Sequence, residues 1–379
     1  MSESLEVSVV MPCLNEAATV APCVSKALAA MARAGLRGEV VVADNGSSDG
    51  SAALAEAAGA RVVLAPVRGY GAAYLAGLEA ARGYFIVMGD ADATYDFDDI
   101  PAFVAKLKDG NDLVIGSRFA GEILPGAMPW LHRYIGNPVL TGILGLFFGQ
   151  RVSDAHCGMR AMTRDANERM DLRTNGMEYA SEMIAMAIRR GLRVAELPII
   201  YHPREGESKL RSFRDGWRHL RFMLLLSPTP LFLAPGLVML AVGLAGLGVL
   251  APGPLRVFGM TFDFHFMFVA SALAILGVQL IVLGLAAKAV ARAELHVIDR
   301  WLAFLDRWFT LERGIVIGAA VLVAGLGVNV WILADWLHAG RGSLFAVRPA
   351  LVGLTLFVVG TQLVFGSFFI SVVQGDARG

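Results

Sequence analysis

Residues 83–92 read Gly83-Tyr84-Phe85-Ile86-Val87-Met88-Gly89-Asp90-Ala91-Asp92, a short apolar run that ends in two carboxylates. The segment Tyr84–Met88 is short, aromatic and β-branched, which predicts a strand buried in a parallel sheet. Asp90 and Asp92 follow its carboxyl end, where an open α/β sheet binds its ligand. Hard oxygen ligands in this spacing suit Mg²⁺ or Mn²⁺ carrying a diphosphate, because these ions keep positions for other ligands. A solvated acidic loop is the alternative, and the surrounding elements favour the metal site.

Strands and helices alternate on both sides of this run. We expect strands at Val7–Met11, Val40–Ala43, Arg61–Leu64, Tyr84–Met88 and Leu113–Gly116, with helices at about Ala17–Ala34 and Gly71–Arg82. Such alternation predicts an α/β domain with a doubly wound, mostly parallel sheet.

The composition is too apolar for an ordinary soluble enzyme. The 379 residues carry no net charge, 56% of them are hydrophobic, and the mean hydropathy is +0.58. Charges are mixed into the chain up to about Leu226, and long uncharged stretches follow. We expect four membrane spans, at Leu231–Ala251, Phe266–Ala287, Gly314–Ala334 and Pro349–Gln374. Buried helices of a soluble domain are the alternative, which four uncharged runs of this length disfavour.

Two further segments indicate contact with a membrane surface. Ile135–Gly149 is apolar but too short to cross a bilayer. In Ser212–Leu226 the apolar and basic residues fall on different helical faces, which predicts an amphipathic interface helix within residues 212–228. The apolar face is Phe213, Trp217, Leu220 and Leu224, and the basic face is Arg214, Arg218 and Arg221. A surface helix packed on the sheet is the alternative.

Basic residues predict the orientation of the spans. They gather before the first span and between the second and third, at Arg204, Lys209, Arg211, Arg214, Arg218, Arg221, Lys288, Arg292, Arg300, Arg307 and Arg313. The other connections carry only Arg256, Arg341 and Arg348. The positive-inside rule then places both termini and the globular part in the cytoplasm, in an inner-membrane protein. The segment Met1–Glu6 lacks the features of a cleaved signal peptide, and Cys13, Cys23 and Cys157 fit a reducing compartment.

Ordered motifs give the chain a family resemblance. Pro12-Cys-Leu-Asn-Glu16, Asp44-Asn-Gly-Ser-Ser-Asp-Gly50, Asp90-Ala-Asp92 and Gly116-Ser-Arg118-Phe119 resemble the signatures of inverting family-2 glycosyltransferases with a GT-A fold. Asp154-Ala-His-Cys-Gly-Met-Arg160 and Arg204-Glu-Gly-Glu-Ser-Lys-Leu210 are similar to motifs of dolichol-phosphate mannose synthases and polyprenyl-phosphate glucosyltransferases. The resemblance covers about Val7 to Leu226. It implies a GT-A catalytic domain over residues 1–211, and the apolar runs predict an all-α region with four spans over residues 229–379.

The resemblance also implies roles on the donor side. Pro12, Glu16 and Asp44 match positions that hold the nucleoside of a nucleotide sugar. Asp90 and Asp92 match the metal motif for Mg²⁺ or Mn²⁺, and Asp92 counts as catalytic. Thr94 stands where the usual mannose synthase has Gln, which leaves a third metal ligand open. Arg204, Ser208 and catalytic Lys209 match a mobile loop that closes on the diphosphate.

On the acceptor side, Arg118 matches the arginine that meets the lipid phosphate, where a guanidinium fork suits phosphate geometry. Arg133 is expected as a second phosphate contact. Asp154 and Arg160 match positions near the acceptor, with structural hydrogen bonding as the alternative. We expect structural roles for Glu178, Glu182, His156 and His202.

The function expected is transfer of a hexose from GDP-mannose or UDP-glucose to a polyprenyl or dolichyl monophosphate at the cytoplasmic leaflet. The partners are then the donor, the lipid phosphate and the bilayer, with no nucleic acid. One alternative is a glycosyltransferase acting on ceramide or diacylglycerol. Such enzymes carry Gln-x-x-Arg-Trp, and the nearest string, Val297-Ile-Asp-Arg-Trp301, lacks the Gln. The other alternative is a non-catalytic membrane scaffold, which would not need Asp90, Asp92, Arg118 and Lys209 together.

Overall fold

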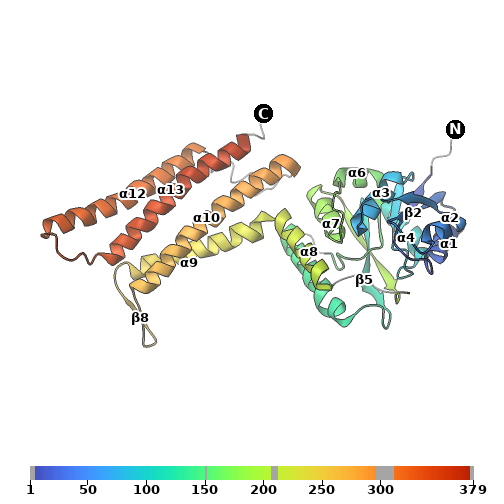
Figure 1. Ribbon diagram of the computed structural model, residues 1–379, viewed down its shortest axis with the longest axis horizontal. Helices are drawn as coiled ribbons and strands as arrows, with labels where there is room; N and C mark the ends of the chain where they lie inside the picture. The colour runs from blue at the N-terminus through green and yellow to red at the C-terminus, as the bar shows by residue number, and fades with distance from the viewer. Residues whose placement is uncertain (1–4, 150–151, 206–211, 296–310, 376–379) are drawn as a thin grey trace. The chain divides into compact units, whose positions relative to one another are not determined.

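The computed structural model describes residues 5–149, 152–205, 212–295 and 311–375 (Figure 1). The chain divides into two compact units, Met1–Met223 and Leu224–Gly379. The division falls inside one helix, so the expected limits 1–211, 212–228 and 229–379 stay predictions.

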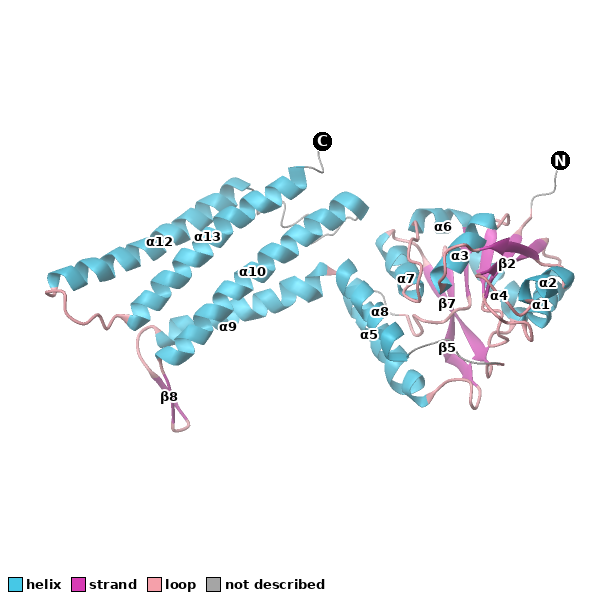
Figure 2. Ribbon diagram, viewed as in Figure 1, coloured by secondary structure: helices cyan, strands magenta, loops and turns pink. Residues whose placement is uncertain are grey.

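The first unit is built on a seven-stranded sheet in the order β3-β2-β1-β4-β6-β5-β7, drawn in magenta in Figure 2. Its neighbouring strands run parallel except β6, which is antiparallel to both β4 and β5. The predicted mostly parallel α/β sheet is therefore confirmed. The strands are β1 Val7–Cys13, β2 Gly38–Asp44, β3 Arg61–Leu64, β4 Phe85–Met88, β5 Leu113–Ile123, β6 Arg160–Thr163 and β7 Val194–Tyr201.

Three of these strands differ from the sequence prediction: β5 is longer than expected, and neither β6 nor β7 was predicted. The strand β5 runs on to Ile123, so Arg118 lies within it and not just after it. The strand β6, Arg160-Ala-Met-Thr163, was not predicted, because it lacks the β-branched pair that marks β3, Arg61-Val-Val-Leu64. Its insertion between β4 and β5 places the segment before it, residues 154–159, at the carboxyl end of β4.

Helices connect the strands, and the two predicted between strands, α1 and α3, begin and end within a few residues of the limits expected. They are α1 Val20–Arg33, α2 Ser51–Ala57, α3 Tyr70–Ala80, η1 Phe97–Asp99, α4 Ile100–Lys108, η2 His132–Gly136, α5 Asn137–Phe148, α6 Arg164–Met170, α7 Tyr179–Arg189 and α8 Ser212–Leu226. The short apolar segment that was expected at a membrane surface forms η2 and α5.

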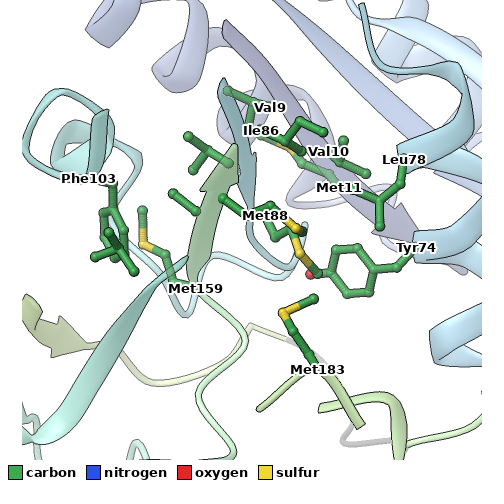
Figure 3. Packing of buried hydrophobic residues seen from close by; sticks show 14 of the residues in the cluster. Val9, Val10, Met11, Tyr74, Leu78, Ile86, Met88, Phe103, Met159 and Met183 are labelled. Carbon is green, nitrogen blue, oxygen red and sulfur yellow. The ribbon is translucent and has the colours of Figure 1, made fainter. Parts of the chain in front are cut away.

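Apolar side chains fill both sides of the sheet. The strand residues Val9, Ile86 and Met88 are at most 2% exposed. Figure 3 shows Phe103 of α4 and Tyr74 of α3 on opposite sides of these strands. Because β1 and β4 are covered on both faces, their carboxyl ends are held rigidly, and the loops that follow them begin from fixed positions.

The helix α8 has the boundaries expected for the amphipathic segment. Asp215, His219 and Met223 form its buried stripe, at most 8% exposed each. Phe213 and Trp217 are 85% and 59% exposed. The helix therefore packs on the first unit through a mixed polar stripe and leaves its aromatic residues uncovered.

Among its described residues, the second unit contains four helices long and apolar enough to cross a membrane, which confirms the four expected spans. They run over Thr229–Leu250, Phe264–Val290, Leu311–His338 and Val347–Val373. The elements are η3 Thr229–Leu233, α9 Ala234–Leu250, β8 Leu255–Val257, β9 Met260–Phe262, α10 Phe264–Leu295, α12 Leu311–His338 and α13 Val347–Gly375.

Small residues bring two of these helices into backbone contact. A Cβ added at Gly325 of α12 would lie 2.4 Å from the Phe357 nitrogen, and one at Gly360 of α13 would lie 2.4 Å from the Leu322 nitrogen. Glycine is required at both positions, because any Cβ would collide with the backbone of the neighbouring helix. Such close approach of backbones is typical of helix packing in lipid.

Candidate functional site

The loops after β1 and β2 are tied together at the carboxyl edge of the sheet. Asn15 Oδ1 accepts a hydrogen bond from the Ser48 backbone at 2.8 Å, and the Glu16 N–H donates to Ser51 Oγ at 2.8 Å. Asn15 adopts a φ of 53°, a left-handed conformation that asparagine tolerates better than most residues. Glu16, which was predicted to hold a nucleoside, therefore lies beside the second loop, just past Pro12.

Asp44 shapes the second of these loops. It is 6% exposed, and its Oδ2 accepts hydrogen bonds from the backbone N–H groups of Gly46 and Ser47, each at 3.2 Å. A carboxylate bonded to the backbone just after it is an Asx turn. The predicted contact between Asp44 and a nucleoside stays a prediction.

Asp90 is held from two sides. Its Oδ1 accepts hydrogen bonds from the hydroxyls of Tyr70 at 3.0 Å and Tyr74 at 3.1 Å. Its Oδ2 lies against Gly158, where an added Cβ would be 2.8 Å away. Burial, with a further contribution from the charge of Asp92, raises the pKa of Asp90 to about 7.

Asp92 is held by two neighbours. Thr94 donates to its Oδ1 from both hydroxyl and backbone, at 2.5 and 3.1 Å. Arg204 lies 3.2 Å from its Oδ2 and donates from Nη2 to Glu16 at 2.6 Å. Four residues that the sequence assigns to the donor side thus meet at one place. The Thr94 hydroxyl faces Asp92 here, so its predicted role as a third metal ligand stays a prediction.

The two carboxylates fit a hard divalent cation. Each has one oxygen tied to the protein, while Asp90 Oδ2 makes no hydrogen bond among the described residues and Asp92 Oδ2 faces only the cationic Arg204. Within the described part of the chain, no third His, Cys, Asp or Glu completes a protein-only cage. Two carboxylate oxygens with the remaining positions left to phosphates and water are typical of Mg²⁺ sites.

Arg118 is buried and already paired. Its Nε and Nη2 donate to the two carboxylate oxygens of Asp154, at 2.6 and 2.7 Å. Its guanidinium lies 5.1 Å from the centre of the Tyr201 ring. The fork that the sequence assigned to an acceptor phosphate is therefore occupied by Asp154, and the described residues leave only Nη1 without a hydrogen bond. A phosphate contact through Arg118 is accordingly a contact through one nitrogen.

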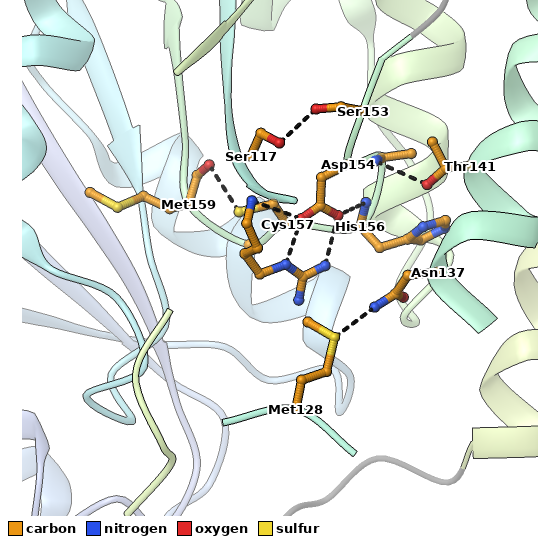
Figure 4. Close-up of polar contacts among 12 residues, drawn as sticks. Ser117, Met128, Asn137, Thr141, Ser153, Asp154, His156, Cys157 and Met159 are labelled. Atoms are coloured by element: carbon orange, nitrogen blue, oxygen red, sulfur yellow. Dashed lines mark hydrogen bonds and ion pairs between the residues drawn. The ribbon is translucent and has the colours of Figure 1, made fainter. Parts of the chain in front are cut away.

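The segment 154–160 links this arginine to Asp90. Figure 4 shows a hydrogen bond from the backbone N–H of His156 to Asp154 Oδ1, with 3.3 Å between nitrogen and oxygen. The Gly158 N–H donates to the Tyr95 hydroxyl at 2.7 Å, beside Asp90. Arg160 is 2% exposed and donates three hydrogen bonds to backbone carbonyls, which is the structural role left open for it.

An apolar groove is formed by α5 and by residues next in the chain to Arg118 and Asp154. Its volume is about 760 Å³. Phe119 and Ser153, the chain neighbours of the ion pair, line one side, and α5 lines the other. Its lining is Phe119, Pro138, Thr141, Gly142, Gly145, Leu146, Val152 and Ser153. A groove with few polar groups beside a buried cation suits a ligand with an anionic head and an apolar chain.

Three predicted site residues remain, Arg133, Ser208 and Lys209. Arg133 lies on η2 with its guanidinium 5.5 Å from the centre of the Tyr134 ring, so its phosphate contact stays a prediction. Ser208 and Lys209 lie outside the described residues, as do Arg300, Arg307 and the Val297–Trp301 string.

Some residues that hold the site residues in place were not predicted from the sequence. Tyr70 and Tyr74 hold Asp90, and their spacing of four on α3 was the available signal, because such residues share a helix face. Glu182 accepts from the backbone and hydroxyl of Thr174 at 2.9 and 2.6 Å, as expected of a structural residue. Ser181, which bonds two histidines, gave no signal in the sequence.

Two family descriptions match the sequence. "Glycosyl transferase family 2" matches residues 8–171, and "Glycosyltransferase family 2 C-terminal transmembrane region" matches residues 285–374. Both agree with the fold, since the first lies on the sheet and the second on the helices of the membrane unit.

Three named relatives match between 48% and 96% of the chain. The low-salt glycan biosynthesis hexosyltransferase Agl6 of Haloferax volcanii is 43% identical over 96% of this chain and 88% of its own. The dolichyl-phosphate hexose transferase of the same organism is 36% identical over 48% of this chain and 77% of its own. The undecaprenyl-phosphate 4-deoxy-4-formamido-L-arabinose transferase of Klebsiella pneumoniae is 29% identical over 80% and 93%.

Among solved structures, a match is glucosyl-3-phosphoglycerate synthase of Mycobacterium tuberculosis in complex with Mn²⁺, uridine-diphosphate-glucose and phosphoglyceric acid. Its TM-score is 0.47 at 24% identity, over 58% of this chain and 79% of that one. The identity and coverage shared with Agl6, together with the two family matches and the four spans, decide the assignment. The chain belongs to glycosyltransferase family 2 and is an integral membrane protein.

Proposed function

We propose that the protein transfers a hexose from a nucleotide sugar to a polyprenyl monophosphate, with inversion, at the cytoplasmic face of the membrane. The observation that carries the proposal is the apolar groove that begins at the neighbours of the Arg118–Asp154 pair. A polyprenyl phosphate has the matching chemistry, an anionic head on a branched apolar chain. The names of two relatives, a dolichyl-phosphate and an undecaprenyl-phosphate transferase, support the same acceptor class.

The donor is assigned to the other half of the site. Glu16 and Asp44 offer carboxylate oxygens that accept hydrogen bonds from ribose hydroxyls or base N–H groups. Asp90 and Asp92 would hold Mg²⁺ or Mn²⁺, which when bound offsets negative charge on the donor diphosphate. Arg204 contacts both Glu16 and Asp92, which supports a role for its guanidinium in offsetting the charge of the donor diphosphate.

The acceptor phosphate needs no strong general base. The second pKa of a phosphate monoester is about 6, so its attacking oxygen is anionic at neutral pH. The residues must instead place that oxygen behind the anomeric carbon, opposite the diphosphate. Arg118 Nη1 is the nitrogen available for this, and the Asp154 carboxylate fixes its direction. One direct displacement then inverts the anomeric centre.

Exposed apolar residues are assigned to the bilayer surface. On η2 and α5, Tyr134 and Leu146 are 59% and 79% exposed, and on α8, Phe213 and Trp217 are similarly uncovered. Aromatic and apolar side chains of this kind partition into the headgroup region. The excess of basic residues in the connections supports a cytoplasmic site, where nucleotide sugars are available.

The test is an acceptor panel. Purified protein is incubated with GDP-mannose or UDP-glucose, a divalent cation, and polyprenyl phosphate, ceramide or diacylglycerol, and the lipid products are identified by mass. We expect a hexosyl product from polyprenyl phosphate alone. A product from ceramide or diacylglycerol would replace the proposed acceptor, and nucleotide binding without any transfer would identify a non-catalytic protein.

A further inference from the structure

A buried chain of three polar side chains connects α8 to the loop that holds Arg118. Ser181 Oγ on α7 lies 2.8 Å from His219 Nδ1 on α8 and 3.2 Å from His156 Nε2. The two imidazole rings pack edge to face, with 4.6 Å between centroids and 85° between planes. Ser181 is 0% exposed and His219 7%.

This chain reaches Arg118 through Asp154. His156 donates from its backbone N–H to Asp154 Oδ1 at 3.3 Å, and the same carboxylate binds Arg118 through two nitrogens. His219 is therefore connected to the acceptor arginine through Ser181, His156 and Asp154. The connection runs along hydrogen bonds, which fix direction as well as distance.

The electrostatics keep both histidines neutral. Burial lowers the pKa of His156 well below its usual range, and the pKa of His219 falls to about 4 for the same reason. The charge of His219 adds to the lowering of the His156 pKa, as do the cations Arg160 and Arg118. At His219, Arg160 also lowers the pKa, whereas Asp215 on α8 partly opposes the shift. A neutral imidazole has one donor and one acceptor nitrogen, so a serine hydroxyl can bond one ring as donor and the other as acceptor.

Simple docking of α8 does not require these groups. Met223 on the same helix is 0% exposed and supplies apolar packing. Burying a polar side chain costs free energy unless it is hydrogen-bonded. The buried side chains of His156 and His219 each hydrogen-bond to Ser181. His156 Nδ1 is buried with no partner among the described residues. A set of polar groups of this kind fixes one geometry more strictly than apolar packing does.

We propose that His219 is a positioning residue for the acceptor: through Ser181 and His156 it holds Asp154, and so Arg118, in the geometry that receives the acceptor phosphate. The inference rests on the proposed function. It makes α8, the helix that leads into the first span, part of the acceptor site while it leaves the donor site alone.

The experiment compares three α8 variants of the full-length protein. His219→Leu removes the hydrogen bond, His219→Asn keeps a polar group near the position of Nδ1, and Met223→Ala loosens α8 without touching the three polar groups. For each we would measure the acceptor KM, kcat, the nucleotide-sugar Kd and the Tm. A lost hydrogen bond of this class predicts an acceptor KM raised about three- to tenfold in His219→Leu.

The expected pattern is a split between the two substrates. His219→Leu raises the acceptor KM with unchanged donor Kd, His219→Asn recovers most of it, and Met223→Ala lowers only the Tm. Should His219→Leu fail to fold, Ser181→Ala must show the same split. A normal acceptor KM in these variants, an equal loss for donor and acceptor, or the same effect from Met223→Ala would overturn the proposal. Failure of the proposed function is distinct, because then the wild type itself shows no saturation with polyprenyl phosphate.

Discussion

Gly158→Ala tests the geometry of the carboxylate pair with a single methyl group. An alanine Cβ at this position would lie 2.8 Å from Asp90 Oδ2, 3.0 Å from the Tyr95 hydroxyl and 3.1 Å from the Tyr70 hydroxyl. Comfortable contacts of this kind need about 3.5 Å. The substitution therefore displaces Asp90, the tyrosines that hold it, or both, by roughly half an ångström.

The expected loss follows from what these tyrosines do. Residues that orient a metal ligand typically contribute about ten- to a hundredfold to metal affinity. That range corresponds to about 1.4–2.8 kcal/mol. We expect the Kd of Mn²⁺, measured by electron paramagnetic resonance in the presence of nucleoside diphosphate, to rise by this factor in Gly158→Ala, and kcat to fall with it.

The matched control is Gly248→Ala on α9, because a Cβ there has no atom within 4 Å and the residue lines no part of the groove. It should leave Mn²⁺ affinity and kcat unchanged. The reasoning about Asp90 is refuted if Gly158→Ala folds with a normal Tm and binds Mn²⁺ as tightly as the wild type. It is also refuted if both glycine variants lose affinity alike.

Four further predictions concern the metal, the groove, the orientation and acid stability. Asp92→Ala should abolish transfer, and full turnover in excess chelator would contradict the metal requirement. Gly142→Leu should fill the groove and raise the KM for polyprenyl phosphate about tenfold, with the donor Kd unchanged. The factor corresponds to the loss of two methylene-sized contacts of about 0.8 kcal/mol each. Cysteine at position 256 should react with an impermeant label in intact cells and cysteine at position 292 should not; the reverse pattern rejects the cytoplasmic site. Burial lowers the pKa of His219 to about 4 in the folded state, against about 6.5 in the unfolded chain. The free energy of unfolding therefore has its full value above about pH 6.5 and falls by up to about 3 kcal/mol as the pH drops toward 4. Tm should accordingly fall less steeply over this range in His219→Asn than in the wild type.

The sequence predicted the limits of those elements that depend only on neighbouring residues. The strand before the aspartate pair was expected at Tyr84–Met88 and is Phe85–Met88, because one apolar run sets both its burial and its end. The helix Ser212–Leu226 was predicted with the limits it has, since its apolar and basic residues repeat at helical spacing. The four spans were equally clear from length and hydropathy.

Contacts between distant segments were not predictable in the same way. Arg118 was assigned a free fork, but Asp154, 36 residues away, occupies it. The antiparallel strand that follows Asp154 is Arg160-Ala-Met-Thr163, which has no run of β-branched residues and so gave no strand signal. Hydrogen bonds of this kind depend on the strand order, and a single sequence does not contain the pairing of β6 with β4.

The central claim is that an oxygen of the acceptor phosphate attacks the sugar. It is tested by supplying polyprenyl phosphate whose phosphate oxygens carry a heavy-oxygen label and following the label by mass spectrometry. The account predicts a lipid product with one phosphate and one hexose that keeps all of the label, beside unlabelled nucleoside diphosphate. A lipid product with a second, unlabelled phosphate, or a hexosyl lipid without the label, would contradict it.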